Sequence, residues 1–504
     1  MVTTNDPRVP GQDAHLIAGH PDAWRNPTPA RCYHLAIIGA GPAGLAAAER
    51  ARASGAKVAL IERGRLGGVC LNTGCIPSKS IVRTARLYAG MREAQRYGAQ
   101  VPDVIAVDFA AAMARVRRIR RHLESADWVH RLRSTGVDLF CGDARFGGRD
   151  WLMVDGQRLH FDNALIATGA RPEIPEIPGL AQTGFMTNEN VFDLTQLPPR
   201  LLVIGGGPLG CELAQAFCRL GARTTIVQDM PLFLGNEERD AAQILSDAFA
   251  RDGIEVRLNT TVEAVRRQDG EIRADLVSAD YRNTIAIDAI LIGAGHAPQL
   301  DGLNLAAAGI GMNTRGGVEV DDFLRTENRQ VYAAGDACLE HKYTNSARAS
   351  AQIAVGNALF GGRQRLSKLI VPWCTFTDPE IAHVGLYVGQ ANRQGIPVKT
   401  FTLPMHQIDR AVTDSEAEGF VKIHVRERSD TILGATIVAR HAGDMLGEIT
   451  LAMTTGIGLR TLARIIQPYP TQADAIRQAA EAYVRTRTRA RAPLRWRFRQ
   501  WLAT

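Results

Sequence analysis

Short apolar runs, each followed by a glycine-rich turn and then a helical pattern, are the main feature of the hydrophobic pattern. The first run, Leu35–Ile38, leads into Gly39-Ala-Gly41-Pro-Ala-Gly44, after which small residues recur at helical spacing. A second apolar run, Val58–Ile61, ends at Glu62. Strand, glycine turn, helix and strand in this order predict a Rossmann-type unit that binds a dinucleotide.

The glycines of this turn have physical tasks. They permit the tight turn itself, the approach of backbone to a pyrophosphate, and close packing of helix on strand. The helix N-terminus attracts phosphates, and an acid at the end of the second strand can accept hydrogen bonds from a ribose. We therefore expect Gly39, Gly41, Gly44 and Glu62 to bind a nucleotide.

The same pattern occurs a second time. Leu201–Ile204 leads into Gly205-Gly-Gly207-Pro-Leu-Gly210, a helix is predicted to about Arg219, and Thr224–Val227 is the next strand. Gly39 and Glu62 are 23 residues apart, and the same step from Gly205 reaches Gln228. We therefore predict Gln228 as the ribose-reading residue of a second nucleotide site. Because the adjacent Asp229 repels a 2′-phosphate, the sequence favours NADH over NADPH.

Two cysteines lie just downstream of the first turn. Cys70 and Cys75 are separated by four residues in GGVCLNTGCIPSK, which spans residues 67–79. Such a pair can close a disulfide, open as a dithiol or bind a soft metal. Beside a bound flavin or nicotinamide it becomes a two-electron relay. An inert structural disulfide is the alternative, whereas a tetrahedral zinc site needs a second pair, so we predict no resident metal.

Composition narrows the class of protein. A chain of 504 residues with 45% hydrophobic residues and 48 glycines indicates a multidomain α/β enzyme. Eight cysteines are too few for a disulfide framework, which favours the cytoplasm. No apolar run approaches the ~18 residues of a membrane span. Residues 1–30 contain no apolar core segment, and we expect a mobile extension there.

The net charge of +7 is concentrated near the C-terminus, where residues 485–504 contain seven arginines and no acid. The rest is near neutral, so specific nucleic-acid binding is not expected. The tail also contains Trp496, Phe498 and Trp501, a mixture that suits weak contact with a membrane surface or a solvated tail. A second basic cluster, predicted to be a solvated helix face, contains Arg115, Arg117, Arg118, Arg120 and Arg121.

Two dinucleotide fingerprints around a CxxxxC pair resemble the flavin-dependent pyridine nucleotide–disulfide oxidoreductases, over about residues 31–483. Further family-like runs are Ala167-Thr168-Gly169, Ala333-Ala-Gly-Asp336 and Thr377-Asp-Pro-Glu380. The stretches 136–146 and 212–221 look most like mercuric reductase. The resemblance implies that the first fingerprint binds FAD, with Gly68, Thr168, Gly169 and Asp336 contributing. It implies that the second binds NAD(P)H, with Gly205, Gly207, Gly210, Gln228 and Gly295.

The resemblance also implies catalytic roles. Cys70 is the expected interchange thiol and Cys75 the thiol beside the flavin, while Lys79 and Glu212 are expected to pair near the flavin ring. The implied architecture is α/β, with two Rossmann-like nucleotide-binding domains and an α+β dimerisation domain. The predicted divisions are residues 1–30 (extension), 31–171 and 296–364 (FAD domain), 172–295 (NAD(P) domain), 365–484 (dimerisation domain) and 485–504 (tail). A homodimer follows, in which Tyr469 serves the partner subunit's Cys70.

Three departures from the family pattern affect the expected chemistry. Val69 replaces the usual threonine, so we expect no hydroxyl support for the thiolate. The His-Pro-Thr-x-x-Glu motif is here Tyr469-Pro-Thr-Gln-Ala-Asp474, and the C-terminal cysteine pair and N-terminal metal-binding module of mercuric reductases are missing. Because tyrosine has a pKa of about 10, Tyr469 is a poor general base for lipoamide or glutathione turnover. Asp474 is shorter than the family glutamate, and Tyr469 can equally be a packed ring without a catalytic role.

A soft metal ion needs little beyond deprotonated thiols. The sequence therefore favours an FAD-dependent NAD(P)H oxidoreductase that is mercuric-reductase-like and delivers electrons to a thiol-bound metal ion or disulfide. Dihydrolipoyl dehydrogenase is the alternative enzyme. A membrane- or nucleic-acid-docked flavin redox sensor is the alternative from another class.

Overall fold

The computed structural model describes residues 24–124, 132 and 134–490. These form two compact units, the first built from residues up to 205 with 262–276 and 283–369, the second from 206–261, 277–282 and the residues from 370 onward. Most of the predicted N-terminal extension and of the basic tail lies outside the described residues. None of the helices in the described part of the chain is long and apolar enough to span a bilayer.

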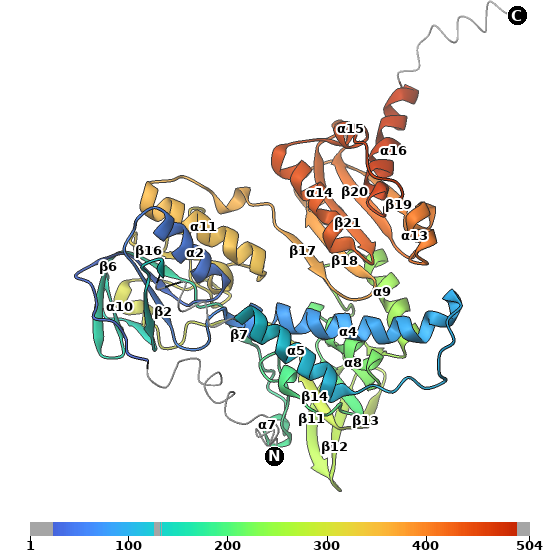
Figure 1. Ribbon diagram of the computed structural model, residues 1–504, viewed down its shortest axis with the longest axis horizontal. Coiled ribbons are helices and arrows are strands. Elements are labelled where there is room, and N and C mark those ends of the chain that lie inside the picture. The colour runs from blue at the N-terminus through green and yellow to red at the C-terminus, as the bar shows by residue number, and fades with distance from the viewer. Residues whose placement is uncertain (1–23, 125–131, 133, 491–504) are drawn as a thin grey trace, which may run out of the picture. The chain divides into compact units, whose positions relative to one another are not determined.

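The main sheet of the first unit contains the predicted first Rossmann strand (Figure 1). Its order is β3-β2-β1-β6-β5-β4, and β16 pairs with β6. β1 is parallel to both of its neighbours, β2 and β6. β5 is antiparallel to both β4 and β6. The strands are β1 Tyr33–Ile38, β2 Val58–Glu62, β3 Asp138–Cys141, β4 Ala144–Phe146, β5 Trp151–Val154, β6 Gln157–Ile166 and β16 Val331–Ala333.

Helices α2 (Pro42–Ala53) and α11 (Thr344–Phe360) pack against each other beside this sheet (Figure 1). Ala43, Ala47 and Ala351 are buried there with Leu35 and Ile37 of β1. The small side chains predicted after the glycine turn therefore allow helix and sheet to approach closely. The short elements α10 (Leu305–Ala308), η3 (Gly335–Ala337) and η4 (Leu366–Lys368) complete this part.

The segment that contains Cys70 and Cys75 is helical. The helices are α3 Gly68–Asn72, α4 Cys75–Glu93, η1 Ala94–Tyr97 and α5 Phe109–Glu124, and α5 packs on both α3 and α4. The rest of the unit pairs β8 with β14, β7 with β15, and β11 through β12 with β13. These elements are β7 Ala170–Pro172, α7 Leu180–Thr183, η2 Val191–Asp193, β8 Arg200–Ile204, β11 Thr261–Gln268, β12 Glu271–Val277, β13 Arg282–Ile287, β14 Ala289–Ile292 and β15 His296–Pro298.

The second unit joins the rest of the second nucleotide-binding pattern to a C-terminal sheet. The first part contains α8 Pro208–Arg219, β9 Arg223–Val227, α9 Arg239–Asp252 and β10 Glu255–Arg257. The sheet is antiparallel in the order β17-β18-β21-β20-β19. Its elements are β17 Pro372–Thr375, β18 Glu380–Gly385, α12 Val388–Arg393, β19 Val398–Pro404, η5 Met405–Gln407, α13 Asp409–Thr413, β20 Phe420–Arg426, β21 Ile432–Ala439, α14 Ala442–Thr455, α15 Leu459–Leu462 and α16 Asp474–Ala490.

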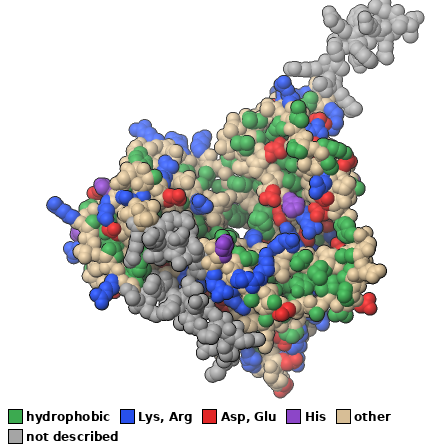
Figure 2. All heavy atoms as spheres, in the orientation of Figure 1, with side chains coloured by type: hydrophobic (Ala, Val, Ile, Leu, Met, Phe, Trp, Pro, Cys, Tyr) green, Lys and Arg blue, Asp and Glu red, His purple; other side chains and the backbone are tan. Residues whose placement is uncertain are grey.

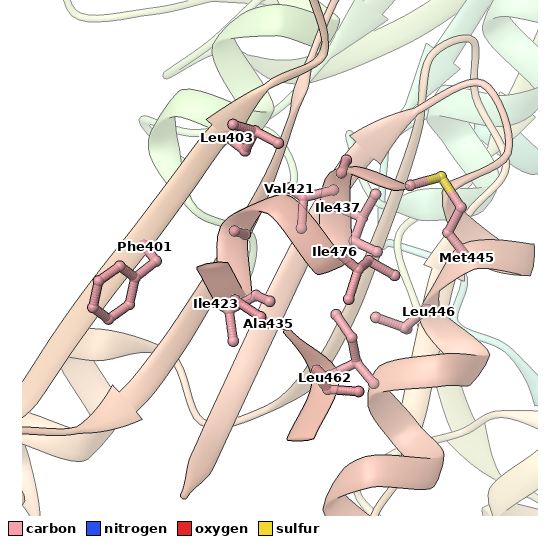
Figure 3. Close-up of a cluster of buried hydrophobic side chains, with 14 of the residues drawn as sticks. Phe401, Leu403, Val421, Ile423, Ala435, Ile437, Met445, Leu446, Leu462 and Ile476 are labelled. Atoms are coloured by element: carbon pink, nitrogen blue, oxygen red, sulfur yellow. The ribbon is translucent and has the colours of Figure 1, made fainter. Parts of the chain in front are cut away.

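The core of the C-terminal sheet lies between the strands and α14, α15 and α16. Val421 and Ile437 from the strands meet Leu446, Leu462 and Ile476 from these helices (Figure 3). The alternating apolar positions of the strands thus face one helical layer. The α/β class and the α+β C-terminal region predicted from the sequence are confirmed.

Candidate active site

The first glycine turn is held by contacts that only glycine allows. A Cβ on Gly39 (φ +103°) would lie 2.4 Å from the Ala167 carbonyl oxygen, and one on Gly44 would lie 1.8 Å from the Gly39 oxygen. Gly41 precedes α2, whose first residue is proline. Glu62 is also part of the turn, because its carboxylate accepts from the amides of Ala40 (2.6 Å) and Gly64 (2.7 Å). Hydrogen bonds within the chain and close packing therefore hold the shape of this turn.

The cysteine segment begins against this turn. Gly68 has φ +58°, and a Cβ there would lie 2.8 Å from the Gly41 Cα. Cys70 lies within α3, and Cys75 is the first residue of α4. All eight cysteines are free thiols in this structure. The predicted thiol pair thus lies directly beyond the predicted phosphate-binding turn.

The two thiols interact with each other. A hydrogen bond with Cys75 and then burial raise the pKa of Cys70, while the Thr344 hydroxyl and the charge of Lys79 act to lower it. Because the two sulfurs share a hydrogen bond, the pair loses its two protons at different pH values. Lys79 lies one turn after Cys75 on α4. The dithiol is therefore coupled to a nearby cation.

The expectation that the dithiol lacks hydroxyl support is wrong. Val69 indeed has no hydroxyl, but Thr344 at the start of α11 places its Oγ1 3.3 Å from the Cys75 Sγ. The two residues are 269 positions apart. Sequence spacing gave no signal for Thr344, because its position depends on how α11 packs.

Two further side chains suit a bound flavin. Thr168 Oγ1 is buried and has no hydrogen-bond partner among the described residues. Burial raises the pKa of Asp336 to about 6, against an opposing effect of Lys342, and the nearby Cys75 raises it further. Lys342 Nζ donates to the His296 carbonyl, next to Gly295 (φ +122°). An unsatisfied hydroxyl, a buried acid and a glycine cradle fit a polar cofactor such as FAD. Gly169 (φ +73°) has open space around its Cα.

The second glycine turn repeats the first in detail. Gln228 Oε1 accepts from the Gly206 amide at 2.6 Å, as Glu62 accepts from Ala40. A Cβ on Gly205 would lie 2.4 Å from the Gly293 oxygen, and Gly207 precedes α8. Gln228 Nε2 donates to Asp229 at 3.0 Å. The arrangement fits a second nucleotide, with Gln228 in the place that Glu62 has in the first turn.

Glu212 is buried on α8, two residues after Gly210. Its Oε1 accepts from the Phe376 amide at 2.9 Å. One and two turns later, Gln215 and Arg219 bind Asp378, so a single face of α8 contacts the segment between β17 and β18. The pairing of Glu212 with Lys79 stays a prediction.

Tyr469 and Asp474 are not bonded to each other. Tyr469 is 76% exposed, and its hydroxyl donates to Asp409 Oδ2 at 2.7 Å. This hydrogen bond raises the pKa of Tyr469. Asp474 instead accepts from Arg477 (2.6 Å) and Gln478 (2.7 Å), and these bonds lower its pKa although burial opposes them. Asp409 was missed because it lies 60 residues from Tyr469.

The interpretation of the arginine cluster on α5 as a solvated face is wrong for two of its members. Arg115 donates to the Ser80 carbonyl (2.9 Å) on α4, and Arg120 donates to the Asn72 carbonyl (3.4 Å), the last residue of α3. These arginines therefore tie α5 to both cysteine-bearing helices. Figure 2 shows Lys and Arg side chains gathered on the face where α4 and α5 run in Figure 1.

Within the described residues, no three His, Cys, Asp or Glu side chains are grouped so as to hold a metal ion. The described residues offer two thiols with a nearby lysine and a buried carboxyl group, and, separately, two glycine turns that fit nucleotides.

Comparison with known proteins agrees with this picture. Residues 33–358 match the family model of pyridine nucleotide-disulphide oxidoreductases, and residues 371–480 match the dimerisation domain of the same family. The chain is similar to a mercuric reductase of Streptomyces lividans (35% identity, covering 90% of this chain and 96% of that one). It is also similar to a dihydrolipoyl dehydrogenase of Thermus scotoductus (32%, covering 90% and 97%).

Solved structures give the same result. The HOCl-induced flavoprotein disulfide reductase RclA from Escherichia coli, which was also solved as a Cu(II) complex, covers 89% of this chain and 99% of its own with a TM-score of 0.80 and 28% identity. LpdA from Mycobacterium tuberculosis has a TM-score of 0.81 at 28% identity, covering 89% of this chain and 99% of its own.

Proposed function

Because the chain belongs to the pyridine nucleotide-disulphide oxidoreductase family, we propose that Cys70 and Cys75 are its redox-active pair and deliver two electrons to a soft metal ion such as Hg²⁺. The chain is an FAD-dependent oxidoreductase that uses NAD(P)H. When bound, FAD supplies two-electron transfer between the nicotinamide and the thiols. The observation that carries the proposal is the hydrogen-bonded dithiol directly beyond the first glycine turn.

The residues of this chain manage thiols and protons. Two thiols bind one Hg²⁺ as thiolates and release two protons, and the Thr344 hydroxyl and the charge of Lys79 favour this loss of protons by stabilising thiolate. In the overall reaction, NAD(P)H and Hg²⁺ give NAD(P)⁺, H⁺ and metallic mercury, so electrons and charge balance. No proton acceptor of imidazole type is needed in this reaction. The exposed, high-pKa Tyr469 therefore suits metal reduction better than dithiol exchange.

The test compares two substrates on purified yellow protein. NAD(P)H oxidation is followed with mercuric chloride and excess 2-mercaptoethanol, and NAD⁺ reduction is followed with dihydrolipoamide. We expect the mercuric reaction to be the faster one. Cys70→Ser and Cys75→Ser should each lower it at least about a hundredfold, whereas Cys32→Ser, the matched exposed control, should leave it unchanged. Faster turnover of dihydrolipoamide would replace the proposal with a dihydrolipoyl dehydrogenase.

We also propose that the enzyme is a homodimer formed by residues 371–480. The support is the family match of this segment, together with exposed apolar side chains on it, of which Ile466 is 95% and Leu451 63% exposed. Light scattering of Ile466→Glu is expected to give monomer where the wild-type chain gives dimer. A dimeric variant at the same concentration would contradict the role of this surface.

Three smaller proposals concern the donor, the tail and the location. Gln228 bonded to Asp229 supports a preference for NADH, which the ratio of kcat/KM for NADH and NADPH measures.

Weak membrane-surface contact of residues 485–504 is tested by binding of the full chain and of a chain ending at 484 to anionic vesicles. A cytoplasmic location, expected from the cysteine content, is tested by cell fractionation.

A further inference from the structure

A pocket of about 570 Å³ lies at the end of α11, in the first unit. Its lining includes Phe323, Tyr332 and Asn357 together with three arginines, Arg325, Arg363 and Arg365. A volume of this size is within the range of small-molecule sites. Thr344, which contacts Cys75, begins the same helix, and the 17 residues of α11 separate the two ends by roughly 25 Å. The pocket is therefore distinct from the dithiol site.

The acids near the pocket are already bonded. Asp321 accepts from the Arg325 side chain (2.9 Å) and from the Phe323 amide (2.9 Å). Asp322 accepts from the amide (2.8 Å) and the hydroxyl (2.9 Å) of Ser367.

The guanidinium groups of Arg363 and Arg365 have few ion-pair partners. The nearest approach of Arg365 to Asp322 is 3.9 Å, and Arg363 forms no ion pair with any residue that the structure describes. Each guanidinium carries five N–H donors in a planar fork. Arg325 is already paired with Asp321 through Nε and Nη2, so the excess donors and positive charge of the pocket come from Arg363 and Arg365.

The guanidinium groups are also held in place. Arg325 Cζ lies 4.8 Å and Arg365 Cζ 5.6 Å from the centre of the Phe323 ring. Contact with an aromatic face fixes a guanidinium while its N–H groups stay available to a ligand. Burial raises the pKa of Tyr332, so its phenol stays neutral and can donate a hydrogen bond at physiological pH.

The walls of the pocket are rigid before a ligand enters. Asn357 Nδ2 donates to the carbonyls of Phe323 (3.0 Å) and Gln364 (2.9 Å), and its Oδ1 accepts from the Gln364 amide (3.0 Å). One buried side chain thus joins the two segments that carry the arginines. A Cβ on Gly362 would lie 2.8 Å from the Gly356 oxygen, so this turn also depends on glycine.

We propose that this pocket binds a small phosphorylated molecule with at least two negative charges. Planar guanidinium forks match phosphate oxygens, and several of them together favour a multiply charged anion. The volume exceeds what a single phosphate fills, which leaves room for the group that carries it.

The experiment uses the flavin-loaded enzyme with saturating NAD⁺ and inorganic pyrophosphate as the probe, measured by calorimetry at low salt. We expect binding that Arg363→Ala/Arg365→Ala weakens at least about tenfold. The charge-conserving Arg363→Lys/Arg365→Lys should lose about threefold, because the charge remains but the fork is lost. Arg315→Ala removes an exposed arginine of the same unit that pairs with Glu340 at 2.7 Å, and it should bind as the wild type does.

Flavin content and NAD(P)H turnover of the double alanine variant should stay unchanged, which shows that it is folded. The proposal is overturned if wild-type enzyme binds no pyrophosphate at millimolar concentration, or if the double alanine variant binds it as tightly. Neither result bears on the electron acceptor, so this site stands or falls separately from the proposed function.

Discussion

The dithiol loop (residues 67–79) and the tyrosine loop (residues 469–474) differ in how the fold holds their reactive groups. Cys75 contacts Cys70 and the Thr344 hydroxyl, and the loop begins at Gly68 against the first nucleotide-binding turn. Tyr469 is exposed, and its hydroxyl donates a hydrogen bond to Asp409. Residues that must react in one geometry need support from several sides. The comparison supports the proposal that the first loop carries the chemistry, whereas the second exposes its tyrosine.

The comparison is tested most severely at Gly68. Gly68→Ala places a Cβ 2.8 Å from the Gly41 Cα at φ +58°. The strain is on the order of 3 kcal/mol, so we expect turnover to fall about a hundredfold, with loss of bound flavin. Gly90→Ala on α4 is the matched control, because a Cβ there meets nothing within 4 Å. The absorbance ratio of flavin to protein and the turnover rate measure both variants. Full flavin content in Gly68→Ala would show that the first glycine turn does not depend on the dithiol loop.

Asp336 tests whether burial at the dithiol site costs stability. Its pKa is raised to about 6 from 3.8, so the folded protein favours the protonated form. Stability from this group is complete below pH 4 and is lost as the pH rises through 6. Asp336→Asn should therefore stabilise flavin-free protein at pH 7.5 by on the order of 3 kcal/mol and have no effect at pH 4. Thermal unfolding at both pH values measures this. An equal Tm difference at both would refute the electrostatic cause.

Thr344 tests the hydroxyl that approaches Cys75. Thr344→Val removes one hydrogen bond to sulfur, so we expect an approximately fivefold lower rate at neutral pH. Because the hydroxyl lowers the pKa of Cys70, its loss should also move the rising limb of the pH–rate profile to higher pH. Thr344→Ser keeps the hydroxyl and should retain the wild-type profile. Identical profiles for Val and Ser would remove Thr344 from the mechanism.

The smallest effect is expected in the tyrosine loop. Tyr469→Phe and Asp409→Asn each remove one exposed hydrogen bond, and the mercuric reaction should change less than about threefold. The raised pKa of Tyr469 keeps its phenol neutral, so the pH–rate profile from pH 6 to 9 should not move. A tenfold loss in either variant would make the tyrosine loop catalytic and erase the contrast with the dithiol loop.

The local design of both nucleotide sites could be predicted from the sequence. The equal spacing from Gly39 to Glu62 and from Gly205 to Gln228 corresponds to the same hydrogen bond in each turn, which an amide of the glycine loop donates to the side-chain oxygen. Strand, turn and helix of such a unit are close together in the chain, so their periodicity and glycine positions are sufficient. The position of Lys79 one turn after Cys75 follows from helix geometry in the same way.

Only the tertiary structure determined the surroundings of these groups. It placed Thr344 at Cys75, Asp409 at Tyr469, and Arg115 and Arg120 against the cysteine-bearing helices. Each of these contacts joins residues that are far apart in the chain, and each depends on how whole helices and strands pack. No local periodicity encodes such packing, because a side chain on a predicted helix can face solvent or a neighbouring element with the same pattern. The sequence therefore identified the candidate reactive groups, and packing determined what surrounds them.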